Sequence, residues 1–286
     1  MAAGMTTYTD ISSLLPDIWE GALIVARDNT LMESLVRGFA DMQGVTPRKS
    51  SIYGTVTFRE VAETDDIVPQ TYTRSLKSTL TPAEKAASFF LSDTRIETDD
   101  QDIVSDASRE LGVGLAQKVE ADVLGDFSSL TGGTIGAAGT TLTWGHILAA
   151  QSRLRAANAP QPFYCVLHPY QWHQLGKTMT ITQGAKQNAP DSLLETVVRN
   201  FWQDTVYGIQ FFTTSNLAID SNDDTTAAMF SRDAMALDSR RAPRLERQRD
   251  ASRRGWELVM TAVYAHGTWR PEWGIQIVSD ATAPSS

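Results

Sequence analysis

The stretch TDDQDIVSDASRELGVGLAQKVEADVLGDF, residues 98–127, carries the clearest helical pattern in the chain. Thr98 and Gln101 are spaced as a capping box, and the aspartates around them suit the positive end of a helix dipole. Apolar side chains then recur every four residues, at Ile103, Ala107, Leu111, Leu115, Val119 and Val123. This repeat predicts one long helix from about Asp99 to Phe127, with an apolar stripe on one face.

Two glycines, Gly112 and Gly114, lie in the middle of the predicted helix. Each costs about 1 kcal/mol relative to alanine at such a position. Close packing against a neighbouring element would explain them, and so would a bend in the helix. The sequence gives these two explanations equal weight.

Residues 1–50 contain two predicted helices. Pro16 is typical of the first position of a short helix. Thr30 and Glu33 are spaced as the capping box of a second helix, which Gly44 ends. The second helix would carry its apolar side chains on one face, at Leu31, Leu35, Val36 and Phe39.

Residues 51–98 predict an extended ribbon. Tyr53–Val61 and Thr71–Leu80 are rich in Thr, Tyr, Val and Phe, which is typical of strands. A two-stranded ribbon with so few apolar residues is marginal by itself, so we expect it to lie on a neighbouring subunit. Local rules open a helix at Thr81-Pro82, so residues 85–91 are predicted either as that helix or as a returning strand.

The chain changes character after a glycine-rich stretch at Thr131–Thr141, which predicts a flexible connector and a domain boundary. Beyond it, helices and strands alternate, as is typical of a compact α/β domain around a small sheet. The predicted helices are 144–157, 169–175 and 193–201, and the predicted strands are 163–167, 206–213, 227–231, 256–264 and 274–278. An interrupted basic segment, Arg240–Arg254, precedes the last two strands.

The motifs of common active sites are absent from the sequence. It contains no phosphate-binding loop, no nucleophile elbow and no complete set of zinc ligands. Cys165, the one cysteine, is expected to be a packed strand residue, and residues 220–224 are expected to form a turn. We therefore expect no catalytic residues, no metal and no cofactor.

The balance of charge argues against a free-standing nucleic-acid binder, because the net charge is −9 and such proteins usually carry a basic surface. Seven arginines nevertheless gather between residues 240 and 254. They either contact DNA or pair with acids on a neighbouring subunit, and the acidic chain favours pairing. No apolar run approaches the roughly 20 residues of a membrane helix, and one cysteine gives no sign of an oxidising compartment.

Eight short motifs follow one another along residues 55–278. They are Leu80-Thr81-Pro82, Leu91-Ser92-Asp93-Thr94, Glu110-Leu111-Gly112, Lys118-Val119-Glu120-Ala121-Asp122, Leu130-Thr131, Leu142-Thr143, Val166-Leu167-His168-Pro169-Tyr170 and Trp269-Arg270-Pro271-Glu272-Trp273-Gly274. Each motif is weak alone, but their order and spacing resemble those of HK97-like major capsid proteins of tailed bacteriophages.

The resemblance implies an α+β fold of four parts. Residues 1–50 would form an N-terminal arm, 51–97 an extended loop over the adjacent subunit, 98–140 with 240–286 a peripheral domain around a long spine helix, and 141–239 an α/β axial domain. It also assigns 81–91 to the returning strand of the loop, against the local helix signal. Contacts between subunits are expected at Trp19, Phe39, Phe58, Tyr72, Leu76, Arg240, Arg241, Arg244 and Arg247, and a bend of the spine helix at Gly112 and Gly114.

A major capsid protein would assemble as pentamers and hexamers into an icosahedral shell that encloses double-stranded DNA, without enzymatic activity. The expected partners are further copies of the chain, a scaffolding protein, the portal, a decoration protein and packaged DNA held by non-specific contact, with no membrane. The protein would reside in the virion after assembly in the cytoplasm of the bacterial host. The alternatives are an encapsulin-like nanocompartment shell, a soluble enzyme with a scattered active site, and a minor structural protein of the virion.

Two features differ from some members of that family. The chain shows no long N-terminal scaffold segment, so we expect no maturation cleavage and a separate scaffolding protein. Lys77 is the only lysine near the middle of the extended loop, and we expect an ordinary surface lysine rather than a covalent cross-linking residue.

Overall fold

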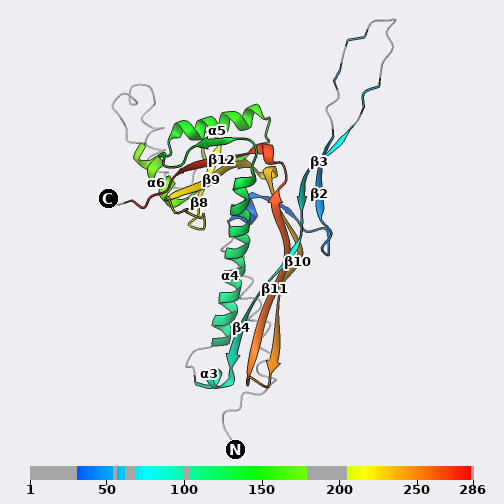
Figure 1. The fold of residues 1–286 in the computed structure, drawn as a ribbon, viewed down its shortest axis with the longest axis vertical. Helices are drawn as coiled ribbons and strands as arrows, with labels where there is room; N and C mark the ends of the chain where they lie inside the picture. Colours follow the sequence, from blue (N-terminus) through cyan, green and yellow to red (C-terminus); the bar gives the residue numbers. More distant parts are fainter. Residues whose placement is uncertain are drawn as a thin grey trace, which may run out of the picture.

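The computed structural model describes residues 31–53, 57–58, 60–61, 69–71, 73–98, 103–178 and 205–284. Figure 1 shows an elongated molecule in which a long helix lies beside a long sheet. A second sheet crosses one end, and a narrow hairpin projects beyond that end on the other side. Separate helices and mixed sheets confirm the predicted α+β class.

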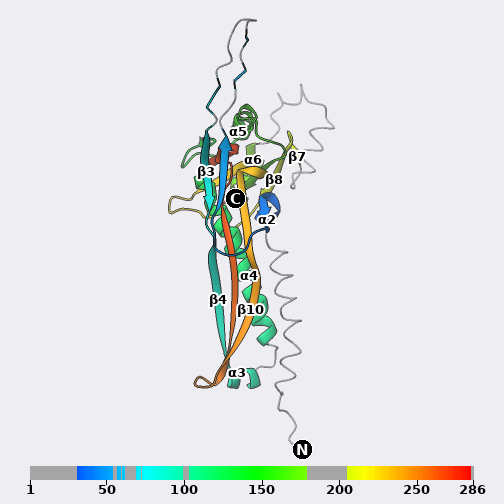
Figure 2. The same ribbon diagram turned by 90° about the vertical axis from the view of Figure 1, so that its right-hand side faces the viewer.

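Four strands form the long sheet, in the order β1 (Arg37–Phe39), β10 (Met235–Asp250), β11 (Gly255–Thr268) and β4 (Ala83–Ser92). β10, β11 and β4 are antiparallel neighbours, whereas β1 pairs in parallel with the start of β10. The helix α4 (Ile103–Gly125) lies along one face of this sheet (Figure 2). The apolar stripe of the helix meets the sheet in a buried cluster of Leu91, Leu111, Leu258 and Met260.

The predicted long helix is confirmed from Ile103 to Gly125. Residues 99–102 lie outside the described residues. At the other end the α-helix stops before the predicted limit and tightens into the 3-10 helix η1 (Asp126–Ser129), which buries Phe127. The short helix α3 (Asp93–Thr98) follows β4 and precedes the start of α4 in the chain.

Strand pairing settles the ambiguity at residues 81–91 in favour of a strand, but this strand belongs to the long sheet and not, as predicted, to the ribbon, whose two strands are β2 and β3. All ten residues of β4, Ala83–Ser92, pair with β11 between Tyr264 and Gly255. A capping signal contributes at most about 2 kcal/mol, so ladder hydrogen bonds along a whole strand override it.

The helix predicted from Thr30 to Gly44 is wrong. The helix α2 (Met32–Leu35) has a single turn, after which Val36 is extended and the chain continues as β1. Val36 is fully buried, and β1 gains backbone pairing with β10 at Ala236–Asp238. Burial and long-range pairing therefore outweigh the local helix signal.

Two strand predictions also change. The hairpin strands are β2 (Arg48–Tyr53) and β3 (Arg74–Leu80), so β2 overlaps the predicted first strand, Tyr53–Val61, only at Tyr53. The basic segment Arg240–Arg254 was predicted as interrupted, yet β10 continues to Asp250. The register of β10 shifts between Ser239 and Arg241 and again between Arg241 and Arg244, an interval that contains Pro243, which has no N–H to donate to the ladder.

The second sheet has six strands, in the order β5 (Thr134–Gly136), β12 (Gly274–Asp280), β9 (Asp224–Ser231), β6 (Phe163–Leu167), β8 (Ile209–Thr213) and β7 (Thr205–Val206). The helix α5 (Trp144–Ala156) buries Ile147, Ala150 and Leu154 against it, and α6 (Pro169–Thr178) follows β6. Residues 240–286 were assigned to the peripheral domain; this is wrong for β12, which pairs with β9 and β5.

The glycine-rich stretch is a place of close backbone approach rather than a flexible connector. A Cβ at Gly132 would lie 2.5 Å from the carbonyl oxygen of Gly274. Gly136 has a φ of +80°, and a Cβ there would lie 2.2 Å from the oxygen of Val278. Only glycine allows β5 to pack this closely beside β12.

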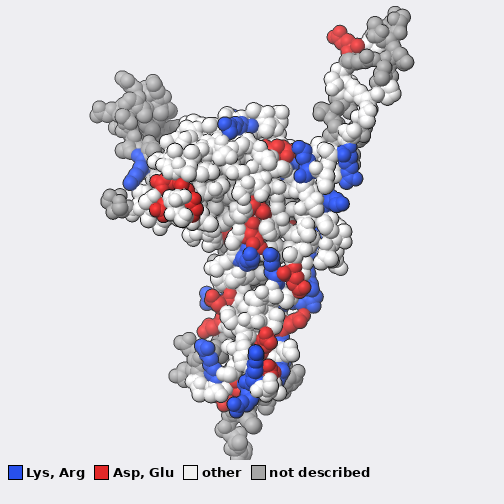
Figure 3. Space-filling model, viewed as in Figure 1, with Lys and Arg blue, Asp and Glu red and all other residues white. Residues whose placement is uncertain are grey.

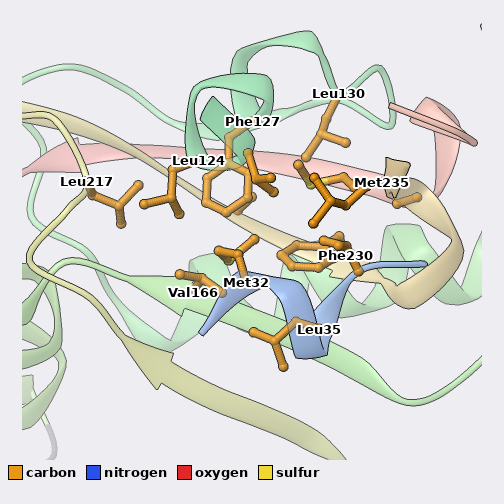
Figure 4. Packing of buried hydrophobic residues seen from close by; sticks show 14 of the residues in the cluster. Met32, Leu35, Leu124, Phe127, Leu130, Val166, Leu217, Phe230 and Met235 are labelled. Carbon is orange, nitrogen blue, oxygen red and sulfur yellow. The ribbon is translucent and has the colours of Figure 1, made fainter. Parts of the chain in front are cut away.

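The two sheets meet in a core to which both contribute (Figure 4). Met32 comes from α2, Phe127 from η1, Phe230 from β9 and Met235 from β10. The rings of Phe127 and Phe230 have centroids 5.7 Å apart. Each such burial contributes about 1.5–3 kcal/mol relative to exposure, so this core holds the two sheets together. The 3-10 helices η2 (Arg232–Ala234) and η3 (Pro271–Trp273) connect the sheets beside it.

Candidate assembly surfaces

The hairpin β2–β3 projects from the body of the molecule (Figures 1 and 2). Apolar side chains on it are exposed. Leu76 in β3 is 55% exposed, and Phe58, beyond the end of β2, is 95% exposed. Exposed aromatic and aliphatic side chains on a projecting element are typical of a surface that a partner covers. Trp19 and Tyr72, also predicted as contact residues, lie outside the described residues.

Phe39 packs within its own chain at the root of the hairpin. Its ring centroid is 5.0 Å from that of Trp269, and the guanidinium carbon of Arg48 lies 4.3 Å from the ring centre. The adjacent cluster buries Leu80 completely. Phe39 thus helps to fix the hairpin to the long sheet, whereas its predicted contact with another subunit stays a prediction.

The arginines of β10 find their acidic partners in the same chain. Arg241 pairs with Glu84 of β4, and Nη1 of Arg244 lies 3.3 Å from Oε1 of Glu246. The guanidinium carbon of Arg247 lies 5.3 Å from the ring centre of Trp256. Carboxylates of the same chain, on β4 and β10, therefore lie beside Arg241 and Arg244, and the pairing of these arginines with acids of a neighbouring subunit stays a prediction.

Among the predicted contact residues that the structure describes, Arg240 is the one that the fold removes from the surface. It is 5% exposed, and its Nη2 lies 2.8 Å from Oδ2 of the buried Asp238. The alternation of side chains along β10 turns Arg240 inward, while its neighbours point outward. Direct contact of Arg240 with another subunit is therefore a wrong prediction.

The two glycines of α4 differ in their surroundings. Gly112 is buried, whereas Gly114 is exposed and a Cβ there would meet nothing within 4 Å. Helix α4 continues through both positions from Ile103 to Gly125. Gly114 lines a groove of about 260 Å³ between α4 and β4, together with Lys85, Phe89 and Leu115. Close packing is thus not the reason for Gly114, and a bend at these glycines remains a prediction.

A charge cluster that no local sequence pattern predicts joins α4 and η1 to β11. Nδ1 of His266 lies 2.8 Å from Oδ2 of Asp126, and the hydroxyl of Tyr264 donates to Asp122 at 2.7 Å. Lys118 donates to the same carboxylate at 2.6 Å. The four-residue spacing of the acids on the helix and the alternation on the strand were visible, but nothing local joined them.

The pKa shifts of His266 and Asp122 favour the charged form of each side chain and so strengthen the cluster. The hydrogen bond to Asp126 raises the pKa of His266, although burial opposes this. Burial would raise the pKa of Asp122, but the hydrogen bonds from Lys118 and Tyr264 outweigh it and lower that pKa. A cationic His266 beside ionised acids is therefore favoured in the folded chain.

The remaining candidate residues serve the fold. Cys165 is a fully buried residue of β6, as predicted, and burial raises the pKa of its thiol. Oδ1 of Asp220 accepts hydrogen bonds from the backbone N–H groups of Asn222 and Asp224, which confirms the predicted turn. The described residues contain no group of three side chains suited to a metal. None of their helices is long and apolar enough to cross a membrane.

Charged side chains of both signs are interspersed over the body of the molecule (Figure 3). Blue and red groups lie side by side at the end of the long sheet, where Arg249 forms a bidentate pair with Asp93 at 2.6 and 2.8 Å. This view shows no uniformly basic face of the kind that binds nucleic acid tightly.

Solved structures of phage capsids and of a virus-like particle share this fold. The capsid of the cyanophage P-SCSP1u has a TM-score of 0.69 at 14% identity, covering 88% of this chain and 89% of that chain. Mycobacterium phage Che8 has a TM-score of 0.63 at 19% identity, covering 87% and 90%. The virus-like particle from Pyrococcus furiosus has a TM-score of 0.57 at 12% identity, covering 92% and 98%.

These likenesses confirm the predicted HK97-like capsid fold. No curated protein matches the chain. A family model described as phage capsid protein matches residues 76–277, which include the long sheet from β4 onward, the spine helix and most of the six-stranded sheet. The chain therefore belongs to the phage capsid protein family.

Proposed function

We propose that this chain is a major capsid protein whose copies associate as pentamers and hexamers and close into an icosahedral shell around double-stranded DNA. The observation that carries the proposal is the projecting hairpin, whose exposed Phe58 and Leu76 have no cover among the described residues of their own chain. The match to the phage capsid protein family supports it.

Three of the four parts of the chain would make contacts between copies. The N-terminal arm (1–50) and the extended loop (51–97) would bind neighbouring copies through Trp19, Phe58, Tyr72 and Leu76, by strand addition and apolar burial. The six-stranded sheet with α5 and α6 would gather around the ring axes as the axial domain. Each contact would be modest, at about 25 cal/mol per Å² of apolar area, and closure of the shell would multiply it.

The role is structural rather than enzymatic. Further copies of the chain are the main partners, and we propose a separate scaffolding protein, a portal and a decoration protein as the others. Packaged DNA would meet the shell through non-specific contacts. The protein would assemble in the cytoplasm of the bacterial host and reside in the virion.

An encapsulin-like nanocompartment shell is the second candidate function. The likeness to the virus-like particle from Pyrococcus furiosus favours it, although at a lower TM-score than the phage capsids above. Such a shell would package a protein instead of DNA, so the contents of purified particles separate the two functions.

Electron microscopy of the purified protein, expressed with and without its candidate scaffolding protein, tests the proposal. We expect uniform closed shells or capsomer rings. A monodisperse small monomer in both preparations would overturn the proposal and reopen the search for a soluble enzyme's active site. Copy number in the virion would separate a major from a minor structural protein.

A further inference from the structure

The root of the β2–β3 hairpin contains a buried ion cluster. Oδ2 of Asp238 in β10 lies 2.8 Å from Nε of Arg48 in β2 and 2.8 Å from Nη2 of Arg240. The side chains of Asp238 and Arg240 are fully buried, and that of Arg48 is nearly so. Arg48 also pairs with the exposed Asp41. One buried carboxylate oxygen therefore serves two arginines, one from the hairpin and one from the long sheet.

This cluster is incompletely paired. Among the described residues, Oδ1 of Asp238 and Nε, Nη1 and Nη2 of Arg240 have no hydrogen-bond partner, although Nη2 lies 2.8 Å from Oδ2 of Asp238 as an ion pair. Buried charged groups without partners are costly, and a carboxylate beside a guanidinium forms its best pair through two parallel hydrogen bonds. Asp238 thus has two pairings available: the shared one, and a bidentate pair with Arg240 alone once Arg48 withdraws.

Arg48 lies where the hairpin meets the body. Arg48 and Leu80 are directly opposite each other as the last pair of the β2–β3 ladder. Leu80 is fully buried against Ala236 and Ala265, and the hydroxyl of Ser78 donates to the carbonyl of Thr268. β3 is therefore fixed by burial, whereas β2 is held at this point by the ion cluster and by the stacking of Arg48 on Phe39.

We propose that Asp238 is a latch that sets the direction of the hairpin. While Asp238 holds Arg48, the hairpin is fixed to the long sheet. When Asp238 pairs with Arg240 alone, β2 is released and the hairpin turns about the anchored end of β3. The inference rests on the proposed function only in one respect, namely that the direction of the hairpin decides which neighbouring copy it reaches.

A distance measurement within one copy tests the latch. Cys165 is fully buried, so cysteines introduced at the exposed positions Leu76 in the hairpin and Gln117 on α4 can be spin-labelled selectively. Pulsed electron paramagnetic resonance on full-length protein, diluted with unlabelled protein, then reports the distance between hairpin and helix. We expect one narrow distribution for the otherwise unmodified protein and a broadened or two-peaked distribution for Arg48→Gln.

Two further variants make the result specific. Arg240→Met removes the alternative partner of Asp238 and should leave the distribution narrow. Arg244→Gln breaks an exposed ion pair on the same strand and is the matched control. A distribution for Arg48→Gln as narrow as that of Arg244→Gln would overturn the latch. If Arg48→Gln does not fold, Arg48→Lys replaces it in the test. Lysine keeps the charge but lacks the guanidinium that bonds to Asp238 and Asp41 together, so Arg48→Lys must still broaden the distribution.

Microscopy of the same variants separates the latch from the proposed function. With the latch, Arg48→Gln yields shells of irregular size or curvature, while Arg240→Met, which keeps the pair of Asp238 with Arg48, assembles normally. If the unmodified protein forms no shells, the proposed function fails, and the distance distributions still decide whether Asp238 controls the hairpin.

Discussion

Gly114 is exposed on α4, with open space where a Cβ would stand. We expect Gly114→Ala to raise the free energy of unfolding by about 1 kcal/mol, because alanine restricts the unfolded chain and favours the helix. Chemical denaturation of the unassembled protein measures this change. Gly112→Ala is the paired comparison at a buried position and should stabilise less. A loss of stability for Gly114→Ala would show that the helix is not straight at this point.

The same substitutions test the proposed bend during assembly. Gly112→Ala combined with Gly114→Ala should stiffen the helix and disturb the shape of the procapsid, which electron microscopy of particles would show. Normal assembly and expansion of the double variant would contradict a bend at these glycines.

His266 gives the fold a pH dependence of predictable sign. Its pKa is raised in the folded chain, so its pairing with Asp126 stabilises the protein fully below the pKa of the unfolded chain. That stability is lost as the pH rises through the folded pKa. We expect His266→Gln to destabilise on the order of 1 kcal/mol at about pH 5.5 and less at about pH 8.5. His173→Gln on α6 is the control, and an equal loss for His266→Gln at both pH values would refute the argument.

At the scale of whole elements, Phe58 and Leu76 belong to a hairpin that contributes little to the stability of its own chain. Replacing both with serine should leave the free energy of unfolding within about 0.5 kcal/mol of the original, because both side chains are exposed. The same variant should assemble poorly, as sedimentation of particles would show. Val45→Ser, which changes an exposed apolar residue outside the hairpin, should assemble normally. Normal assembly of the double variant would remove the hairpin from the set of contacts.

The elements that the sequence predicted well are those whose signal is local. The four-residue repeat gave α4, and the short apolar run at Phe163–Leu167 gave β6. β1 and the true start of β2 were missed because each depends on a partner strand far away in the sequence, β10 for the former and β3 for the latter. Family resemblance correctly made β4 a strand, against its own capping signal, but placed it in the extended loop, whereas it pairs with β11 in the long sheet.

The residues of the candidate assembly surfaces show the same difference between local and long-range signals. The low apolar content of residues 51–98 predicted a ribbon that is marginal by itself and lies on a neighbouring subunit. Leu76 in β3 is exposed in the single chain, as such a ribbon requires. The inward direction of Arg240 and its sharing of Asp238 with Arg48 depend on a ladder register that no local pattern reveals.

At the scale of the whole molecule, covalent links between copies are not expected. Lys77 lies in β3, in a hairpin that binds neighbours only by non-covalent contacts in the proposed assembly. Mature particles boiled in detergent should therefore run on a denaturing gel as single chains of 31.4 kDa. A ladder of covalent multimers would contradict this expectation, and its loss in Lys77→Arg would identify the linking residue.

The passages between the two sheets have a mechanical consequence. Within the described residues, the chain crosses from one sheet region to the other at η1, at η2 and at η3. Backbone hydrogen bonds tie these crossings together, from Thr131 to Pro271 at 2.9 Å and from Trp269 to Ala234 at 2.7 Å. Tension between the two ends of the molecule is thus divided among these three segments of the backbone. The long β10–β11 ladder runs along the length of the molecule, so a load in that direction shears its hydrogen bonds together instead of breaking them one at a time. Such an arrangement suits a shell that must resist pressure from its contents.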